Sequence, residues 1–265
     1  MSHSGNWVFL RGLMRESRHW GDFPAVFRRH VDAADVHVPD LPGNGRLHMQ
    51  DSPMRVSGMV ECYRRALAAQ SAPPPYHLLA LSLGAMTAVE WAHRYPQEVR
   101  SCVLINTSMR PFSPFYRRLH WRVYPEVLRL AMAHADAQAR ERLVLELTSR
   151  GAAAVDATLA AWTAYQNEYP VSRSNALRQL LAAARYHAPA QRPPMPMLVL
   201  TSAADRLVDP ACSRRLADAW KTALFVHPDA GHDLPLDDGP WVARRIATWL
   251  DAGQDSGRLA TQQTI

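Results

Sequence analysis

The sequence contains few cysteines, a single lysine and no long hydrophobic run, and each scarcity excludes a class of protein. The three cysteines, Cys62, Cys102 and Cys212, lack metal-ligand spacing, so we expect buried thiols rather than disulfides or a zinc site. Lys221 is the only lysine and no dense basic run occurs, which argues against nucleic-acid binding despite a formal charge of +6. No apolar run approaches the roughly 18 residues that span a bilayer, and the N-terminus lacks a basic, apolar leader. We therefore expect a cytoplasmic protein without a membrane span.

The remaining composition favours a folded α/β protein. A chain of 265 residues with 48% hydrophobic residues can bury a substantial core. Short apolar runs alternate with helix-like stretches, a pattern typical of a largely parallel sheet covered by helices on both faces. The strand-like runs are 7–10, 36–38, 77–81, 102–105, 197–201 and 223–227. The helical patterns are at about 21–30, 53–70, 84–95, 210–219 and 239–252.

One connection is too long for an ordinary crossover between strands. Between Asn106 and Pro196 the sequence has amphipathic helical segments broken by prolines and no strand-like run. We interpret residues 110–190 as a helical cap inserted into an α/β core formed by residues 1–109 and 191–252. The last residues, 253–265, show no periodicity and are expected to form a flexible tail.

The short stretch Ala80-Leu-Ser82-Leu-Gly84 ends one of the strand-like runs. A serine in a tight strand-to-helix turn takes a strained backbone conformation, which requires small residues two positions before and after it. Ala80 and Gly84 satisfy that requirement. The spacing predicts a catalytic nucleophile at Ser82, although an ordinary turn or helix cap would also explain it.

A nucleophilic serine needs a base and a third group that orients the base. Strand 197–201 leads into a loop that contains Asp205, and strand 223–227 leads into a loop that contains His232. The order Ser82, Asp205, His232 is the one expected when successive strands of such a sheet supply a triad. Asp209 is the alternative acid, but it directly precedes Pro210 and fits a helix cap.

With these motifs in order, the chain resembles the α/β-hydrolase-fold serine hydrolases over roughly residues 6–252. The matching stretches are "VFLRGLMRESRHW" (8–20), "PDLPGNGR" (39–46), "ALSLGA" (80–85), "SAADRLV" (202–208) and "GHDLPLD" (231–237). The resemblance implies that the backbone N–H groups of Leu13 and Leu83 form the oxyanion hole. Where relatives commonly have His-Gly, this chain has Arg11-Gly12, so bracing of the loop by that histidine is lost.

The predicted activity is hydrolysis of a carboxylic ester through an acyl-enzyme intermediate. The same triad would serve an acyl thioesterase acting on a carrier-protein or CoA-linked substrate, or a hydrolase of C–C bonds. A non-catalytic binding protein with this fold is a further alternative. Metal-ligand spacing and a glycine-rich phosphate loop are both missing, so we expect no metal and no cofactor.

The cap is expected to determine specificity. We predict a substrate pocket from a set of aromatic and basic side chains: Arg11, His19, Trp20, Tyr116, Trp121, Tyr124 and Trp162. Packing within the protein is the alternative for each of them. Residues 110–190 also hold eleven arginines against six acidic residues. Those singled out are Arg117, Arg118, Arg122, Arg129, Arg140, Arg142 and Arg150.

We expect these cap arginines either to form a solvated face or to bind an acidic partner, such as an acyl carrier protein or a carboxylated substrate. The general scheme and the basic cap resemble the pimeloyl-carrier-protein methyl esterases. That resemblance implies a small-molecule acyl ester or thioester as substrate and does not establish which one.

Overall fold

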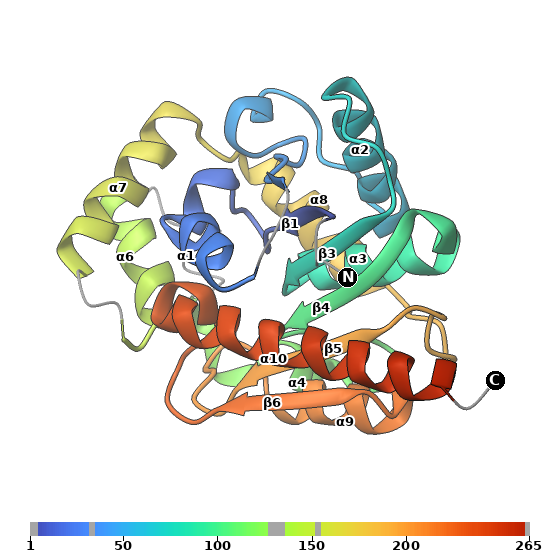
Figure 1. The fold of residues 1–265 in the computed structure, drawn as a ribbon. Coiled ribbons are helices and arrows are strands. Elements are labelled where there is room, and N and C mark those ends of the chain that lie inside the picture. Colours follow the sequence, from blue (N-terminus) through green and yellow to red (C-terminus); the bar gives the residue numbers. More distant parts are fainter. Residues whose placement is uncertain (1–4, 32–34, 127–135, 152–154, 263–265) are drawn as a thin grey trace.

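A six-stranded parallel sheet is the centre of the protein. The computed structural model describes residues 5–31, 35–126, 136–151 and 155–262. The strand order is β2-β1-β3-β4-β5-β6, and every adjacent pair is parallel (Figure 1). The strands are β1 (Asn6–Leu10), β2 (Val36–His37), β3 (Tyr76–Leu81), β4 (Val99–Ile105), β5 (Met197–Ser202) and β6 (Ala223–His227). The predicted α/β class and all six strand-like runs are confirmed.

The strands are apolar throughout because both faces of the sheet are covered. Successive side chains of a strand point to opposite faces. Val8 and Leu10 accordingly belong to one buried cluster, while Trp7 and Phe9 belong to the other. A sheet buried on both sides reads as continuous apolar runs rather than as alternation, which is why the sequence identified the strands clearly.

Helices cover the two faces in separate groups. On one face lie α1 (Phe23–His30) and α10 (Leu234–Gln262), whose side chains pack in the cluster of Trp7. On the other lie α2 (Val56–Ala69), α3 (Leu83–Arg94) and α9 (Ala211–Trp220), which pack in the cluster of Val8. The described residues also form short 3-10 helices: η1 (Ser17–Trp20), η2 (Gly45–Leu47) and η3 (Pro96–Glu98) belong to the core and its connections, and η4 (Trp121–Val123) lies between β4 and β5.

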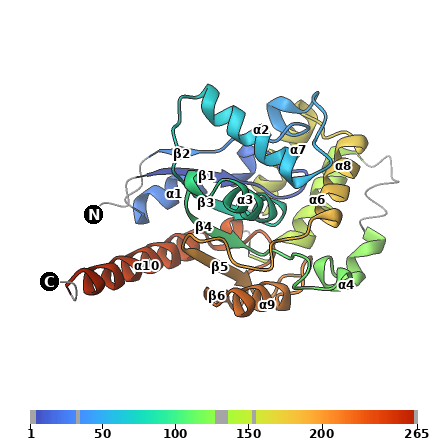
Figure 2. The same cartoon turned by 90° about the vertical axis from the view of Figure 1, so that its right-hand side faces the viewer.

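The described helices between β4 and β5 occupy the segment where the sequence predicts an insertion. They are α4 (Phe115–Arg118), α6 (Ala137–Thr148), α7 (Val155–Glu168) and α8 (Arg173–Arg185). Figure 2 shows α4, α6 and α8 on the side of the molecule opposite both chain ends. Residues 127–135 and 152–154 of the predicted cap lie outside the described residues. The division into core and cap stays a prediction, and α8 complicates it because Ala182 packs in a core cluster.

The last helix corrects one expectation. Instead of a segment without regular structure after residue 252, α10 continues to Gln262, and residues 263–265 lie outside the described part. Glycine in a helix costs only about 1 kcal/mol, so Gly253 does not end the helix. The helix is interrupted earlier, at Asp238, whose carboxylate accepts the N–H of Trp241 at 2.9 Å. Neither α10 nor any other helix in the described ranges is long and apolar enough to cross a membrane.

Candidate active site

Ser82 lies at the turn between β3 and α3 in a strained conformation. Its backbone φ is 56° and ψ is −114°, a combination that costs roughly 1–3 kcal/mol for a residue with a side chain. A Cβ atom at Gly84 would overlap the carbonyl oxygen of Leu10, so only glycine lets α3 begin this close to β1. The N–H of Ser82 donates to the carbonyl of Ile105 at 2.9 Å. This is the turn that the small-residue spacing predicts, with the serine at the carboxyl-terminal end of the sheet.

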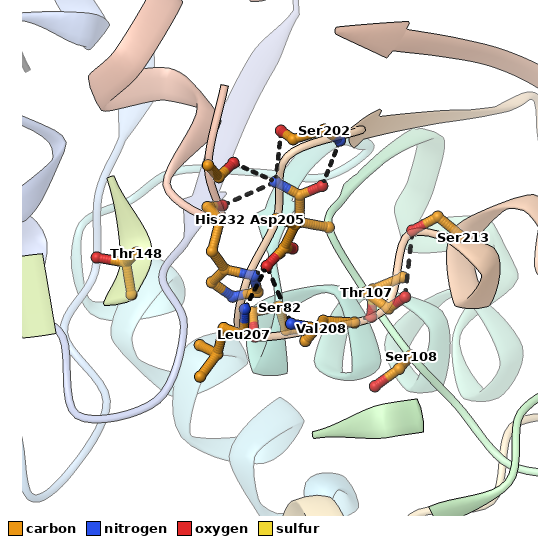
Figure 3. Close-up of polar contacts among 12 residues, drawn as sticks. Ser82, Thr107, Ser108, Thr148, Ser202, Asp205, Leu207, Val208, Ser213 and His232 are labelled. Atoms are coloured by element: carbon orange, nitrogen blue, oxygen red, sulfur yellow. Dashed lines mark hydrogen bonds and ion pairs between the residues drawn. The ribbon is translucent and has the colours of Figure 1, made fainter. Parts of the chain in front are cut away.

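His232 and Asp205 come from two different loops and form a hydrogen-bonded pair. His232 Nδ1 lies 2.7 Å from Asp205 Oδ2, and the two residues are 4% and 8% exposed. The other carboxylate oxygen, Oδ1, accepts the N–H groups of Leu207 at 2.8 Å and Val208 at 2.9 Å. A carboxylate oxygen accepts, so His232 Nδ1 is the donor in this contact. Figure 3 shows this arrangement, with Ser82 drawn beside the His232 ring in this view.

Asn106 and Thr107, directly after β4, join the three loops. The Asn106 amide donates to the carbonyl of His232 at 2.8 Å and accepts the N–H of Ser202 at 2.8 Å. The Thr107 hydroxyl donates to the carbonyl of Ser82 at 3.2 Å (Figure 3). Asn106 has φ 45°, a left-handed conformation that asparagine tolerates better than most residues. Neither residue was predicted from the sequence, although an asparagine directly after a buried strand is a pattern that could have indicated Asn106.

The segment after β1, which contains the predicted oxyanion residue Leu13, passes next to Ser82. A Cβ atom at Gly12 would lie 3.3 Å from that of Ser82, so the two backbones are neighbours. Leu83 is the first residue of α3, and the first four N–H groups of a helix have no intrahelical acceptor. Met14 has φ 56° and donates its N–H to Gln179 Oε1 at 2.8 Å, which anchors the segment to α8.

The comparisons with known proteins agree with this architecture. The family model for the alpha/beta hydrolase fold matches residues 8–239. The chain belongs to this family. A curated relative of this alpha/beta hydrolase is the pimeloyl-[acyl-carrier protein] methyl ester esterase of Chromobacterium violaceum, 31% identical over 241 residues that cover 88% of this chain and 90% of the relative.

Solved structures of low sequence identity share the fold of this alpha/beta hydrolase. The enol-lactonase from Burkholderia xenovorans LB400 aligns with a TM-score of 0.75 at 18% identity, covering 94% of this chain and 92% of the other. The 2-hydroxy-6-oxo-6-phenylhexa-2,4-dienoate hydrolase from Rhodococcus sp. strain RHA1 aligns with a TM-score of 0.74 at 18% identity, covering 94% and 91%. At this level of sequence identity, the structural similarity shows the fold alone.

The predicted pocket residues of this hydrolase divide into two groups. Arg11, His19, Trp20 and Trp162 are buried, and Trp20 packs in the core against Phe9 and Phe23. The other three are exposed: Tyr116 by 49%, Trp121 by 59% and Tyr124 by 40%. The segment that contains them packs against the acid loop, where the N–H of His120 donates to the carbonyl of Leu207 at 2.8 Å. Their role as pocket walls stays a prediction.

His19 is surrounded by cations. Its Nε2 lies 2.9 Å from Arg15 Nη1, and its ring packs edge-on against Trp162 with a centroid distance of 5.3 Å. Burial lowers the pKa of His19 well below 6.5, and the charges of Arg15 and Arg11 lower it further. A neutral, buried ring fits a packing role at the contact between the segment after β1 and α7.

A cavity of about 510 Å³ lies between the acid loop and the inserted helices. Its lining combines three arginines, Arg142, Arg150 and Arg206, with the acidic Glu146 and with apolar side chains that include Leu145 and Leu159. Two other cap arginines already have partners in the protein. Arg117 pairs with Asp209 at 3.1 Å, and Arg118 donates to the carbonyls of Ala183 and Ala184. Arg129 lies outside the described residues.

The remaining candidates have structural partners. Asp209, the alternative triad acid, accepts the N–H of Ala211, the first residue of α9, at 2.9 Å, while the partner of His232 is Asp205. His227 accepts the N–H of Ala230 at 2.9 Å. Within the ranges that the structure describes, no group of three or more His, Cys, Asp or Glu side chains could hold a metal ion.

Proposed function

We propose that this alpha/beta hydrolase cleaves a carboxylic ester with Ser82 as nucleophile, His232 as base and Asp205 as the group that orients the base. The observation that supports this most directly is the buried His232–Asp205 pair at 2.7 Å, joined through Asn106 and Thr107 to the strained turn of Ser82. Nucleophilic catalysis requires a serine in a strained turn and an oriented imidazole, and these are the two parts that Ser82 and the His232–Asp205 pair supply in this proposal.

In the proposed mechanism, Ser82 Oγ attacks the ester carbonyl carbon while His232 Nε2 takes its proton. The N–H groups of Leu13 and Leu83 stabilise the negative charge that develops on the carbonyl oxygen. The imidazolium then gives its proton to the leaving alcohol, and the acyl group remains on Ser82. A water molecule then takes the place of the alcohol, gives a proton to His232 Nε2 and attacks the acyl carbon. The bond between that carbon and Ser82 Oγ breaks, His232 returns the proton to Oγ, and the acid is released. Asp205 keeps Nδ1 protonated, so that Nε2 is the acceptor at the start of each half-reaction.

Ser82→Ala tests the assignment. We expect a drop of about 10⁶-fold in turnover of p-nitrophenyl butyrate, because a triad nucleophile typically contributes that much. The variant should keep the melting temperature of the wild type, and it should not react with a fluorophosphonate probe. Ser57→Ala, at a partly exposed serine of α2, is the matched control and should keep full activity. Substantial turnover by Ser82→Ala would disprove the mechanism.

The alternatives give different results in the same assays. Faster turnover of an acyl thioester than of the matching oxoester would identify a thioesterase. Cleavage of a vinylogous 1,5-diketone, with ester turnover absent, would identify a C–C bond hydrolase. A protein that neither turns over esters nor reacts with the fluorophosphonate would be a binding protein with this fold.

For the substrate, we propose an acyl ester presented by an acidic carrier protein. Two observations support this proposal. The curated relative is described by its name as acting on a methyl ester of a pimeloyl group bound to acyl-carrier protein. The 510 Å³ cavity of this chain combines Arg142, Arg150 and Arg206 with apolar side chains, a lining that suits an acyl group next to an anionic one.

Salt dependence separates carrier binding from general ester hydrolysis. For Arg142→Ala/Arg150→Ala we expect KM to rise about tenfold with a carrier-bound pimeloyl methyl ester and to stay unchanged with p-nitrophenyl butyrate, since rim charges govern association. Raising the salt concentration should reproduce that difference in the wild type. Arg28→Ala/Arg29→Ala, at exposed positions of α1, is the control. Equal effects of salt on both substrates would exclude carrier docking at these arginines.

A further inference from the structure

Arg11 and Asp233 form a buried, two-contact ion pair beside the proposed triad. Arg11 Nη1 lies 3.2 Å from Asp233 Oδ1, and Nη2 lies 2.5 Å from Oδ2. Each side chain is 5% exposed. Arg11 directly follows β1, and Asp233 directly follows His232 in the chain. The pair therefore connects the segment with the predicted oxyanion donor to the loop with the proposed base.

Both partners are themselves held in place. The guanidinium carbon of Arg11 lies 4.7 Å from the ring centroid of Trp20, which packs in the core. The N–H of Asp233 donates to the carbonyl of Thr148, at the end of α6, at 2.7 Å. A guanidinium and a carboxylate that make two parallel contacts fix orientation as well as distance. Each residue of the pair is therefore held by a further contact outside the pair.

The sheet does not set the distance between these two loops. Strands β1 and β6 are separated by β3, β4 and β5, which places them about 19 Å apart at the usual spacing between strands. The loops that follow them must converge above Ser82, beyond the backbone hydrogen bonds of the sheet. Arg11 and Asp233 link the two loops directly.

We propose that Arg11 and Asp233 are positioning residues, which fix the oxyanion segment relative to the His232 imidazole. This inference rests on the proposed hydrolase mechanism. A buried ion pair is poor at stabilising a fold, because apolar residues of similar volume often do equally well. The two-contact geometry instead determines where Leu13 and His232 stand relative to each other. A displacement of about 1 Å at a reacting centre can cost roughly 100-fold in rate.

The test compares Arg11→Met, Asp233→Leu and the double variant Arg11→Met/Asp233→Leu. Each single variant leaves one buried charge without a partner, so its melting temperature should fall. The double variant leaves neither charge, so its melting temperature should return toward that of the wild type. We expect kcat for p-nitrophenyl butyrate to stay about 10- to 100-fold low in the double variant, with KM changed less than about threefold. The rate of fluorophosphonate labelling of Ser82 should fall in parallel.

Arg64→Met is a matched control within the same chain. Arg64 also makes two contacts with a carboxylate, Glu98, at 2.9 and 2.6 Å, and its guanidinium carbon lies 3.7 Å from the ring centroid of Tyr95. Glu98 directly precedes β4, so it lies at the amino-terminal end of the strands, whereas Ser82 lies at their carboxyl-terminal end. Losing this pair should lower the melting temperature and leave kcat unchanged.

Two results would overturn the proposal. One is a double variant that regains wild-type kcat together with wild-type stability, because the pair would then be a structural ion pair only. The other is an unchanged kcat in Arg11→Met. If the double variant does not fold, Arg11→Lys decides: it keeps the charge and loses the two-contact geometry, so kcat should fall at near wild-type stability, and an unchanged kcat rejects the proposal. Activity that survives Ser82→Ala would instead refute the hydrolase mechanism itself.

Discussion

Helix α8 and the pair α6–α7 all lie between β4 and β5, yet they contact the rest of the protein in different ways. Helix α8 buries two amides against the core, Asn175 at 3% and Gln179 at 0% exposure. Helices α6 and α7 instead enclose a small separate cluster, Leu145, Leu159 and Trp162. Within the inserted segment, α8 is therefore attached through buried amides, whereas α6 and α7 pack on each other through apolar side chains.

The amides of α8 hold backbone and side-chain groups of two core loops. Asn175 accepts the N–H of Ser52 at 2.8 Å, and Gln179 donates to the Asn44 side chain at 2.8 Å while accepting the N–H of Met14. In α6, Glu141 lies 2.5 Å from Arg15, and the carbonyl of Thr148, at the end of the helix, accepts the N–H of Asp233 at 2.7 Å. Because two buried amides of α8 hold two core loops at once, we infer that α8 belongs to the framework of the site.

Among the substitutions that test this difference between the helices, Gln179→Leu should have the largest effect, because it removes a hydrogen bond between α8 and the segment after β1. Leucine has a similar volume and cannot accept the N–H of Met14, and an unsatisfied buried donor costs roughly 1–3 kcal/mol. Because Met14 follows Leu13, the predicted oxyanion donor, the segment should also shift. We expect kcat for p-nitrophenyl butyrate to fall about 10- to 100-fold, measured beside the free energy of unfolding in urea.

Leu177→Gln is the reciprocal control on the same helix. Leu177 is 57% exposed, so exchanging the same two residue types there should leave both activity and stability near wild type. A Gln179→Leu protein that loses stability but keeps its kcat would show that α8 supports the fold and not the site.

Local sequence patterns predicted the strands and the turn of Ser82 because each depends on neighbours in the chain. Buried strands are apolar on both faces, and the strained turn requires the small residues Ala80 and Gly84. The extension of α10 to Gln262 was missed because two glycines weaken a helical pattern without preventing a helix.

The contacts that join the loops of the site could not be predicted in the same way. Gln179 and Met14 are 165 positions apart, and Arg11 and Asp233 are 222 positions apart. A glutamine within a helix or an arginine after a strand has many possible partners, and only the packing of the whole chain selects one. The family resemblance pointed to Leu13 and Leu83, but it implied no partner for Arg11.

A smaller effect tests the contact between the core and α7. His19 packs against Trp162 and Tyr165 of α7, and the charged groups that face it are Arg15, Arg11 and Arg18. Burial and these cations lower its pKa in the folded protein below the value of 6.5 in the unfolded chain. Above about pH 6.5 the ring is neutral in both states, so His19 adds no pH dependence there. Below it the unfolded chain takes up a proton that the folded protein does not, and stability falls as the pH falls.

His19→Gln should therefore flatten the acid side of the stability profile. One proton bound only in the unfolded state gives a slope of up to about 1.4 kcal/mol per pH unit, so the wild type should lose about that much more than the variant between pH 6 and pH 5. Urea unfolding at each pH measures the difference, and His93→Gln, at an exposed position of α3, should keep the wild-type slope. Equal slopes in wild type and His19→Gln would mean that His19 accepts a proton without leaving its site. The contact with α7 would then accommodate a protonated His19 beside the three arginines.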